Sequence, residues 1–218
     1  MEAFSNARGA EIVSNLIRAI QENKHYLSEI DGAAGDGDHG INMNKGFTMC
    51  YDELRSSPGN LAHGLKTLSR VLVMNIGGAM GPLYGGFFRA MARTCDGVER
   101  IDEGVFGAML RAGEEAIRQV GGAEVGDKTM LDSLVPAVQA FTSAVAAGSG
   151  FAEALEAMKA AAIQGRDSTR DMIARIGRAS QLGDRSRGLL DAGATSCCLI
   201  LGSMADSVSR LISQEPGG

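Results

Sequence analysis

One short loop concentrates side chains that could bind metal ions. Residues 31–40 read DGAAGDGDHG, which places three aspartates and a histidine among four glycines. Carboxylates this close in sequence repel one another and raise each other's pKa unless cations take up the charge. The donors are mostly oxygen, with one imidazole and no thiolate, which favours magnesium, calcium or manganese over zinc. The sequence therefore predicts a divalent-cation site, with magnesium as the natural candidate.

An EF-hand and a solvated turn are the two other interpretations of this loop. An EF-hand needs a Glu at the twelfth position, but that position is Asn42 when counted from Asp31 and Phe47 when counted from Asp36. The EF-hand is therefore excluded. A solvated turn stays open as the alternative, since Asp and Gly also dominate ordinary turns.

Length and composition indicate one globular domain over residues 1–218. Hydrophobic residues make up 44% of the chain and charged residues 22%, and no Pro/Ser-rich linker divides it. The net charge of −5 argues against nucleic acid as a partner, because duplex binding relies on clustered Lys and Arg. We see neither a secretion signal nor an apolar run long enough to span a membrane, so we expect a cytoplasmic protein. We expect its cysteines to be reduced packing residues, at Cys50, Cys95, Cys197 and Cys198.

Apolar residues recur with helical period along nearly the whole chain. Leu61, Leu65, Leu68 and Leu72 show the spacing clearly, and strand-like alternation is missing. Short Gly- and Pro-containing connections favour antiparallel neighbours, so we predict an all-α, up-and-down bundle or barrel. About eight helices are expected, near residues 12–20, 40–56, 61–76, 82–95, 106–117, 130–147, 151–176 and 193–212.

Thirty glycines, about twice the average share, need an explanation in a helical protein. Glycine destabilises a helix by about 1 kcal/mol relative to alanine, so we expect it at helix ends and close backbone contacts. Four clusters, at 35–40, 77–82, 121–130 and 183–196, each precede a predicted helix. Such loops offer free N–H groups and a positive dipole to an anion, although an ordinary helix cap is the alternative for any single cluster.

The combination of these loops with the acidic loop predicts a magnesium-bound nucleotide. The negative charge left over from the nucleotide and the three aspartates, after the magnesium ions are counted, would be neutralised by Lys128 and Arg178. The glycine-rich segments match neither the Walker GxxxxGK[ST] pattern nor a GxGxxG motif after a strand, so a Walker NTPase and a Rossmann fold are not supported.

At these motifs the chain resembles the nucleotide-binding L subunit, or L domain, of dihydroxyacetone kinases. The resemblance implies an eight-helix antiparallel barrel that binds ADP or ATP at one end through two magnesium ions. It is carried by GDGDHGINMNKGF at 35–47, GGAMGPLYG at 77–85, GDKTMLD at 126–132, and GRASQLGDRSRG followed by DAGATS within 177–196.

The resemblance also implies roles for individual residues. Asp31, Asp36 and Asp38 would be the metal ligands, and Arg178 would be the catalytic residue that stabilises charge on the transferring phosphoryl group. A buried ion pair between Arg178 and Asp184 is the alternative. The positions that would contact the nucleotide are His39, Gly40, Ile41, Asn42, Ala79, Met80, Gly121, Met130, Arg178, Asp191, Ala192 and Gly193.

The implied activity is phosphoryl transfer to a short ketose, dihydroxyacetone or a sugar such as erythrulose, held on a separate K-type subunit. In some relatives a phosphotransferase-system phosphocarrier recharges the bound nucleotide, and in others the nucleotide exchanges with free ATP; the sequence leaves both modes open. Two alternatives stay open as well. One is a nucleotide-sensing regulator or coactivator of the same family, which binds a transcription factor or other partner and catalyses nothing. The other is a helical dinuclear-metal hydrolase, for which we find no evident general base.

Two departures from the family pattern bear on substrate and nucleotide retention. Met80 stands where the family usually has serine, which replaces a hydroxyl donor with a bulky thioether. The usual GHxDPGA reads GLLDAGA at 188–194, so that Leu189 and Ala192 replace a histidine and a proline. These changes indicate a divergent paralogue, which could serve another short ketose such as erythrulose.

Overall fold

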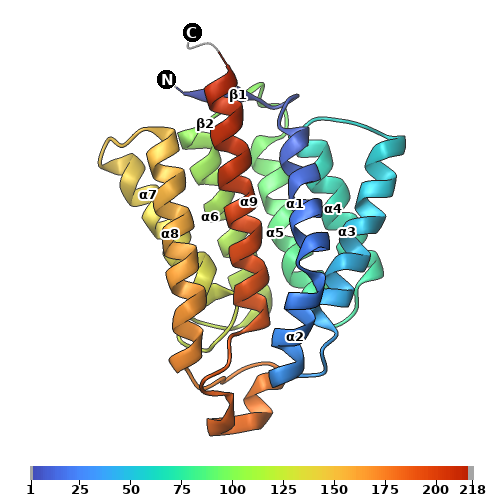
Figure 1. The fold of residues 1–218 in the computed structure, drawn as a ribbon. Coiled ribbons are helices and arrows are strands. Elements are labelled where there is room, and N and C mark those ends of the chain that lie inside the picture. Colours follow the sequence, from blue (N-terminus) through green and yellow to red (C-terminus); the bar gives the residue numbers. More distant parts are fainter. Residues whose placement is uncertain (1, 216–218) are drawn as a thin grey trace.

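Long amphipathic helices of alternating direction form the body of the protein. The computed structural model describes residues 2–215, and the prediction of an all-α fold is confirmed (Figure 1). Within these residues the α-helices are α1 (Ala10–Glu22), α2 (Lys24–Ala34), α3 (His39–Ser56), α4 (Leu61–Asn75), α5 (Met80–Cys95), α6 (Glu103–Gly121), α7 (Leu131–Ala146), α8 (Phe151–Ser168) and α9 (Ala192–Gln214).

Four short elements complete the described chain. The strands β1 (Ala3–Ser5) and β2 (Arg100–Asp102) pair antiparallel, with Phe4 opposite Ile101. The 3-10 helices are η1 (Thr169–Asp171) and η2 (Arg178–Ser186). Each strand has three residues, which is too short to produce a visible alternation of apolar and polar residues, so the sequence analysis missed both.

Two helix predictions need correction. The segment α2 was not predicted, because Leu27 is its one buried residue and a single apolar position gives no period. The helix predicted over 151–176 ends at Ser168 as α8, and residues 169–191 form a long connection that contains η1 and η2.

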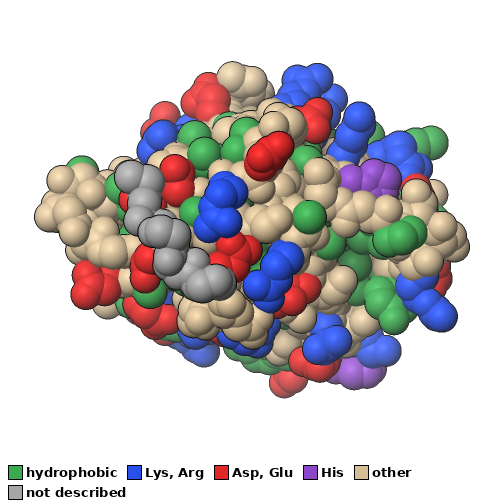
Figure 2. Space-filling view, turned by 90° about the horizontal axis from the view of Figure 1, so that it is seen from above, with side chains coloured by type: hydrophobic (Ala, Val, Ile, Leu, Met, Phe, Trp, Pro, Cys, Tyr) green, Lys and Arg blue, Asp and Glu red, His purple; other side chains and the backbone are tan. Residues whose placement is uncertain are grey.

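The helices form a closed ring whose two ends differ. Successive helices pack side by side from α3 to α9, and α9 packs against α1 (Figure 1). Helices α1 and α2 together cross the length of the barrel once, and each later helix crosses it once in the alternate direction. One end, which we call the loop end, therefore holds the connections at residues 35–38, 76–79, 122–130 and 169–191. Both ends of the described chain, residues 2 and 215, and the remaining connections lie at the opposite, terminal end, where acidic and basic side chains are mixed (Figure 2).

Every α-helix contributes buried apolar side chains to one core. Aromatic rings pack edge to face within it, for example Phe47 against Phe88 and Phe106 against Phe141. The prediction that the cysteines are packing residues is confirmed, because all four are buried free thiols, and burial raises the pKa of Cys95 to about 11. No helix between residues 2 and 215 is both long and apolar enough to cross a bilayer.

A close contact between α7 and α8 fixes the start of α7 at the loop end. Pro136 lies inside α7 and has no N–H to donate to the carbonyl of Asp132, one turn earlier. Gly165 of α8 packs directly on that carbonyl, and a Cβ at position 165 would lie 2.1 Å from the Asp132 oxygen. Position 165 therefore requires glycine.

This contact predicts opposite effects for two glycines in helix interiors. Gly165→Ala should separate α7 from α8 and cost about 1–3 kcal/mol, as overpacked cores do, which corresponds to a fall in Tm of roughly 2–4 °C per kcal/mol for a domain this size. Gly202 of α9 has open space where its Cβ would lie, so Gly202→Ala should leave Tm unchanged or raise it. Thermal denaturation followed by circular dichroism compares the two; equal shifts would contradict the packing argument.

Candidate functional site

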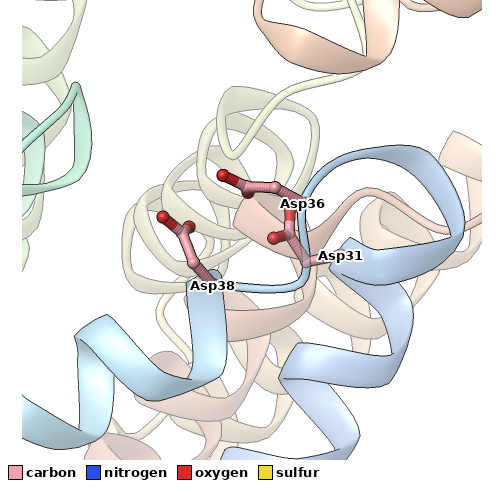
Figure 3. A group of neighbouring side chains, drawn as sticks. All are labelled: Asp31, Asp36 and Asp38. Atoms are coloured by element: carbon pink, nitrogen blue, oxygen red, sulfur yellow. The ribbon is translucent and has the colours of Figure 1, made fainter.

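The three aspartates of the acidic loop come together at the loop end. Asp31 lies in the last turn of α2, Asp36 in the connection, and Asp38 at the N-cap of α3. Each offers a carboxylate oxygen that lies within 4.8 Å of those from the other two, and the three side chains gather over the start of α3 (Figure 3). All-oxygen donors this close suit a hard divalent cation such as Mg²⁺.

Backbone contacts hold the acidic loop in this shape. The backbone N–H of His39 donates to Oδ2 of Asp31 over 3.2 Å, so the two ends of the loop are tied together. Helices α2 and α3 also approach closely at Gly40, where a Cβ would lie 1.9 Å from the carbonyl oxygen of Lys24. The glycine is therefore required by the geometry that brings Asp31 and Asp38 together.

Arg178 carries positive charge to the acidic loop. Its guanidinium, at the start of η2, forms an ion pair with the carboxylate of Asp36. The alternative of a buried pair with Asp184 is wrong, since the Arg178 side chain is 61% exposed and its partner is Asp36. An exposed guanidinium beside the acidic loop is available to an anion that binds there.

Lys128 has a different role from the one we expected. Its side chain is buried, and Nζ donates to the backbone carbonyls of Met172 (3.2 Å), Ser186 and Leu189 (2.8 Å). All three ammonium protons are therefore used within the protein, so Lys128 does not donate to a bound phosphate and could balance its charge only from a distance. Instead, Lys128 folds the long 169–191 connection against the start of α7.

Asp132 is a functional-site residue that sequence reasoning missed. Its buried carboxylate accepts from the backbone N–H of Gly126 (2.6 Å) and of Thr129 (2.7 Å). The turn that carries Lys128 and leads to Met130 is shaped by these two hydrogen bonds. The available signal was an acidic residue in the first turn of a helix directly after a glycine-containing turn.

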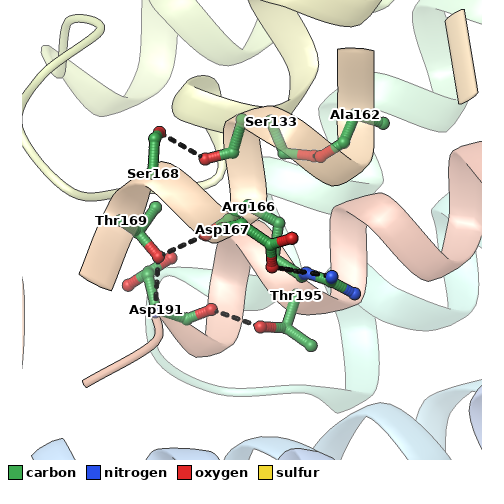
Figure 4. A network of polar contacts seen from close by, with 9 residues as sticks. Ser133, Ala162, Arg166, Asp167, Ser168, Thr169, Asp191 and Thr195 are labelled. Atoms are coloured by element: carbon green, nitrogen blue, oxygen red, sulfur yellow. Dashed lines mark hydrogen bonds and ion pairs between the residues drawn. The ribbon is translucent and has the colours of Figure 1, made fainter. Parts of the chain in front are cut away.

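Asp191 caps α9 and is anchored to the end of α8. Its Oδ2 accepts from the N–H of Ala194 over 2.7 Å, while its own N–H donates to Oγ1 of Thr169 over 3.1 Å (Figure 4). The hydroxyl of Thr195 in turn donates to the Asp191 carbonyl over 2.7 Å. Burial raises the pKa of the Asp191 carboxyl to about 7, against the lowering effect of the Ala194 N–H and the charge of Lys128.

His39 reaches across the loop end to α9. Its Nε2 lies 2.9 Å from Oγ of Ser196. Burial lowers the pKa of the imidazole to about 4, although the charge of Asp31 acts in the opposite direction, so His39 is neutral near pH 7.

The remaining predicted nucleotide positions also lie at the loop end. Because of the up-and-down topology, the N-termini of α3, α5, α7 and α9 all face this end, and their free N–H groups and dipoles favour anions. Met130 lies beside Gly193, whose Cβ would be 3.5 Å from the Met130 backbone nitrogen. The other positions, at the ends of α3, α5, α6 and α9, are Gly40, Ile41, Asn42, Ala79, Met80, Gly121 and Ala192.

Exposed apolar side chains occur at the same end of the barrel as this charged site. Six large apolar residues that are more than a third exposed occur at helix ends or connections of the loop end, and we call them the apolar rim. Exposed apolar surface of this kind is typical of a face that another protein covers. The apolar rim consists of Ile41, Val73, Met74, Val120, Val125 and Ile176.

Comparison with known proteins gives consistent matches. Residues 33–206 match the family model described as the DAK2 domain. The "PTS-dependent dihydroxyacetone kinase, ADP-binding subunit DhaL" of Lactococcus lactis is 39% identical over 87% of this chain and 91% of its own length. A "D-erythrulose kinase" of Mycolicibacterium smegmatis is 33% identical over 92% of this chain, which spans 36% of that protein.

The fold also matches a solved structure. The crystal structure of the dihydroxyacetone kinase from C. freundii in complex with AMP-PNP and Mg²⁺ superposes with a TM-score of 0.70 and 24% sequence identity. The match covers 91% of this chain and 33% of that chain, so this chain spans about a third of that protein.

The acidic loop gives a prediction for cation binding. Asp36→Asn and Asp38→Asn keep the side-chain shape but remove the charge that a cation requires, and each should weaken Mn²⁺ or Mg²⁺ binding at least about tenfold, since even residues that only support a ligand cost that much. Calorimetric titration measures the affinity. Asp52→Asn, an exposed change elsewhere on α3, is the control. Unchanged affinity in both loop variants would mean that the cation binds elsewhere.

Proposed function

The chain belongs to the DAK2 domain family, and we propose that it is an ADP-binding, L-type subunit of a dihydroxyacetone kinase, whose loop end presents a magnesium nucleotide to a short ketose on a partner subunit. The observation that carries the proposal is the convergence of Asp31, Asp36 and Asp38 beside Arg178, at the end where four helix N-termini meet. The site residues named below are part of this proposal.

Each group at the loop end has a chemical task in this scheme. Asp31, Asp36 and Asp38 would hold magnesium, which when bound offsets phosphate charge and orients the phosphoryl group. The N-termini of α3, α5 and α9, with His39, Met80 and Asp191 at or beside them, would donate to phosphate and nucleotide oxygens. Arg178 would face the charge that develops on the transferring phosphoryl group.

Charge balance supports a second magnesium ion. ADP and the three carboxylates together carry about six negative charges, of which two divalent ions would offset about four. Since the ammonium of Lys128 is held by backbone carbonyls, Arg178 is the cation best placed to meet the remainder. We therefore include two ions in the proposal.

The acceptor belongs to the partner in this proposal. The Lactococcus lactis relative is named as a subunit, and the Mycolicibacterium smegmatis relative, a longer protein, is named for erythrulose. We propose a K-type subunit that holds dihydroxyacetone or a related short ketose and docks on the apolar rim. Docking there would cover the exposed side chains and exclude water from the phosphoryl donor.

The name of the Lactococcus lactis relative also favours one way of recharging the nucleotide. It states dependence on the phosphotransferase system, so we propose that a phosphocarrier rephosphorylates ADP that stays bound to this chain. Exchange with free ATP is the competing mode, and Met80 favours it by removing a hydroxyl from the start of α5. A cytoplasmic location, where either donor is supplied, is part of the proposal.

Reconstitution tests the proposed function. Mixed with a cognate K-type subunit, its ketose and a phosphoryl donor, the chain should form ketose phosphate. The chain alone should show almost no kinase activity, because positioning of donor and acceptor dominates phosphoryl transfer. Arg178→Ala should lower the rate by orders of magnitude, about 10³-fold or more by analogy with other arginines that stabilise transferring phosphoryl groups, with less effect on ADP binding. Arg185→Ala, on the same 3-10 helix, is the matched control. Ketose phosphate formed at a comparable rate by the chain alone would refute the two-subunit scheme.

The docking face gives an independent prediction. Met74→Glu puts a charge on a rim side chain that is 71% exposed, so it should weaken K-subunit binding by about tenfold or more, as the loss of a buried interface contact does. ADP binding should be retained. Tyr51→Glu, at an exposed aromatic residue in the second half of α3, is the control. Surface plasmon resonance against the K subunit measures both variants; equal affinities for Met74→Glu and wild type would place the interface elsewhere.

A further inference from the structure

Three side chains from three helices form a hydrogen-bonded line at the loop end. Nε2 of His39 (α3) lies 2.9 Å from Oγ of Ser196 (α9), and that oxygen lies 2.6 Å from the phenol oxygen of Tyr84 (α5). Tyr84 and Ser196 are almost wholly buried. Neither has a role in the function proposed above, but Ser196 contacts His39, which has one, and Tyr84 reaches His39 through Ser196.

The direction of the first hydrogen bond follows from the geometry. The Tyr84 hydroxyl has one proton and two candidate acceptors, Ser196 Oγ at 2.6 Å and the Gly193 carbonyl at 3.4 Å. The first distance is typical of an O–H···O hydrogen bond and the second is too long. Burial raises the pKa of Tyr84 well above its usual value, so the phenol keeps its proton and donates it to Ser196.

The second hydrogen bond then sets the state of the imidazole. Ser196 has one proton to give, to Nε2 of His39 at 2.9 Å or to the Gly193 carbonyl at 3.1 Å. The histidine is the better acceptor, since the contact is shorter and the Gly193 carbonyl also receives the α-helical N–H of Cys197. A neutral imidazole that accepts at Nε2 must carry its proton on Nδ1.

The other ring nitrogen is available to a ligand. Among the residues that the structure describes, Nδ1 of His39 has no hydrogen-bond partner, and it is not among their fully enclosed unpartnered atoms. His39 directly follows Asp38 and opens the first turn of α3. A proton on Nδ1 would therefore be a hydrogen-bond donor beside the acidic loop.

We propose that Tyr84 and Ser196 are positioning residues that hold His39 as its Nδ1–H tautomer, so that the ring donates to phosphate at the loop end. The inference rests on the proposed function for the identity of that ligand. Without the Ser196 donor the proton would be free to move to Nε2, and the nitrogen available to phosphate would become a lone pair that repels it. Since Tyr84 donates to Ser196, it strengthens the hydroxyl as a donor to His39.

Nuclear magnetic resonance tests the tautomer directly. Long-range proton–nitrogen spectra of protein labelled with nitrogen-15 histidine distinguish protonated from unprotonated ring nitrogens, and His39→Gln identifies the His39 signals among the three histidines of the chain. We expect the Nδ1–H form for His39 in wild type, both free and with Mg-ADP. Ser196→Ala should shift the population towards Nε2–H, and Tyr84→Phe should do so to a smaller extent. An Nε2–H ring in wild type, or an unchanged ring in Ser196→Ala, would overturn the proposal.

Kinetics with the K-type subunit provide the second readout. A donor to the transferring group acts mainly in the transition state, so Ser196→Ala should lower kcat about tenfold, which is less than the loss of a direct donor would cause. The affinity for Mg-ADP should change by less than about threefold, because an interaction made mainly in the transition state affects kcat more than ground-state binding. Equal losses in kcat and affinity would indicate a merely structural role and overturn the proposal.

A matched control separates this effect from loss of packing. Ser207→Ala removes another buried hydroxyl of α9, which accepts from Asn15 over 2.9 Å and lies about 16 Å farther along the helix. It should leave both the His39 spectrum and kcat unchanged. If Ser196→Ala does not fold, the wild-type and Tyr84→Phe spectra still decide the outcome. Failure of wild type to bind Mg-ADP would count against the proposed function, whereas the spectrum of the free protein decides the tautomer independently.

Discussion

Repulsion among Asp31, Asp36 and Asp38 is the constraint around which the loop end is organised. Three carboxylates with oxygens within 4.8 Å are unfavourable unless positive charge is near, and the chain supplies it in several forms. The guanidinium of Arg178 pairs with Asp36, the His39 N–H binds Asp31, and four helix N-termini face the same region. These groups compensate part of the negative charge of the three carboxylates. The negative charge that is left would suit a divalent cation together with its anionic ligand.

The supporting contacts come largely from residues outside the predicted nucleotide positions. Asp132 shapes the turn before α7, and Lys128 holds the 169–191 connection by its carbonyls. Thr169 ties the start of α9 to the end of α8 through Asp191. Each of these buried polar groups is satisfied by backbone atoms, which fixes loop conformation without placing further side-chain charge in the site. These hydrogen bonds consequently hold the 122–130 and 169–191 connections in place.

The sequence was sufficient for the helical fold and for the convergence of its glycine-rich loops. Regular apolar spacing, as at Leu61, Leu65 and Leu68, indicates a helix directly. In an up-and-down bundle, every second connection lies at the same end, so the glycine-rich loops are expected to lie together. It was insufficient where partners are distant in sequence. The role of Lys128 depends on carbonyls more than forty residues away, and the line from Tyr84 to His39 spans three helices. A helix with one buried residue, such as α2, likewise leaves no periodic signal.

Eight passes across the barrel place both ends of the described chain on the face away from the acidic loop. There β1 follows the N-terminus, and the backbone N–H of Ser5 binds the side chain of Glu215 over 2.8 Å. An extension at either terminus would therefore start from the side remote from the acidic loop and from the apolar rim. This arrangement suits gene fusion, because a further domain can be appended without interrupting a site loop. It is compatible with relatives such as the Mycolicibacterium smegmatis kinase, in which the matched region is 36% of a longer polypeptide.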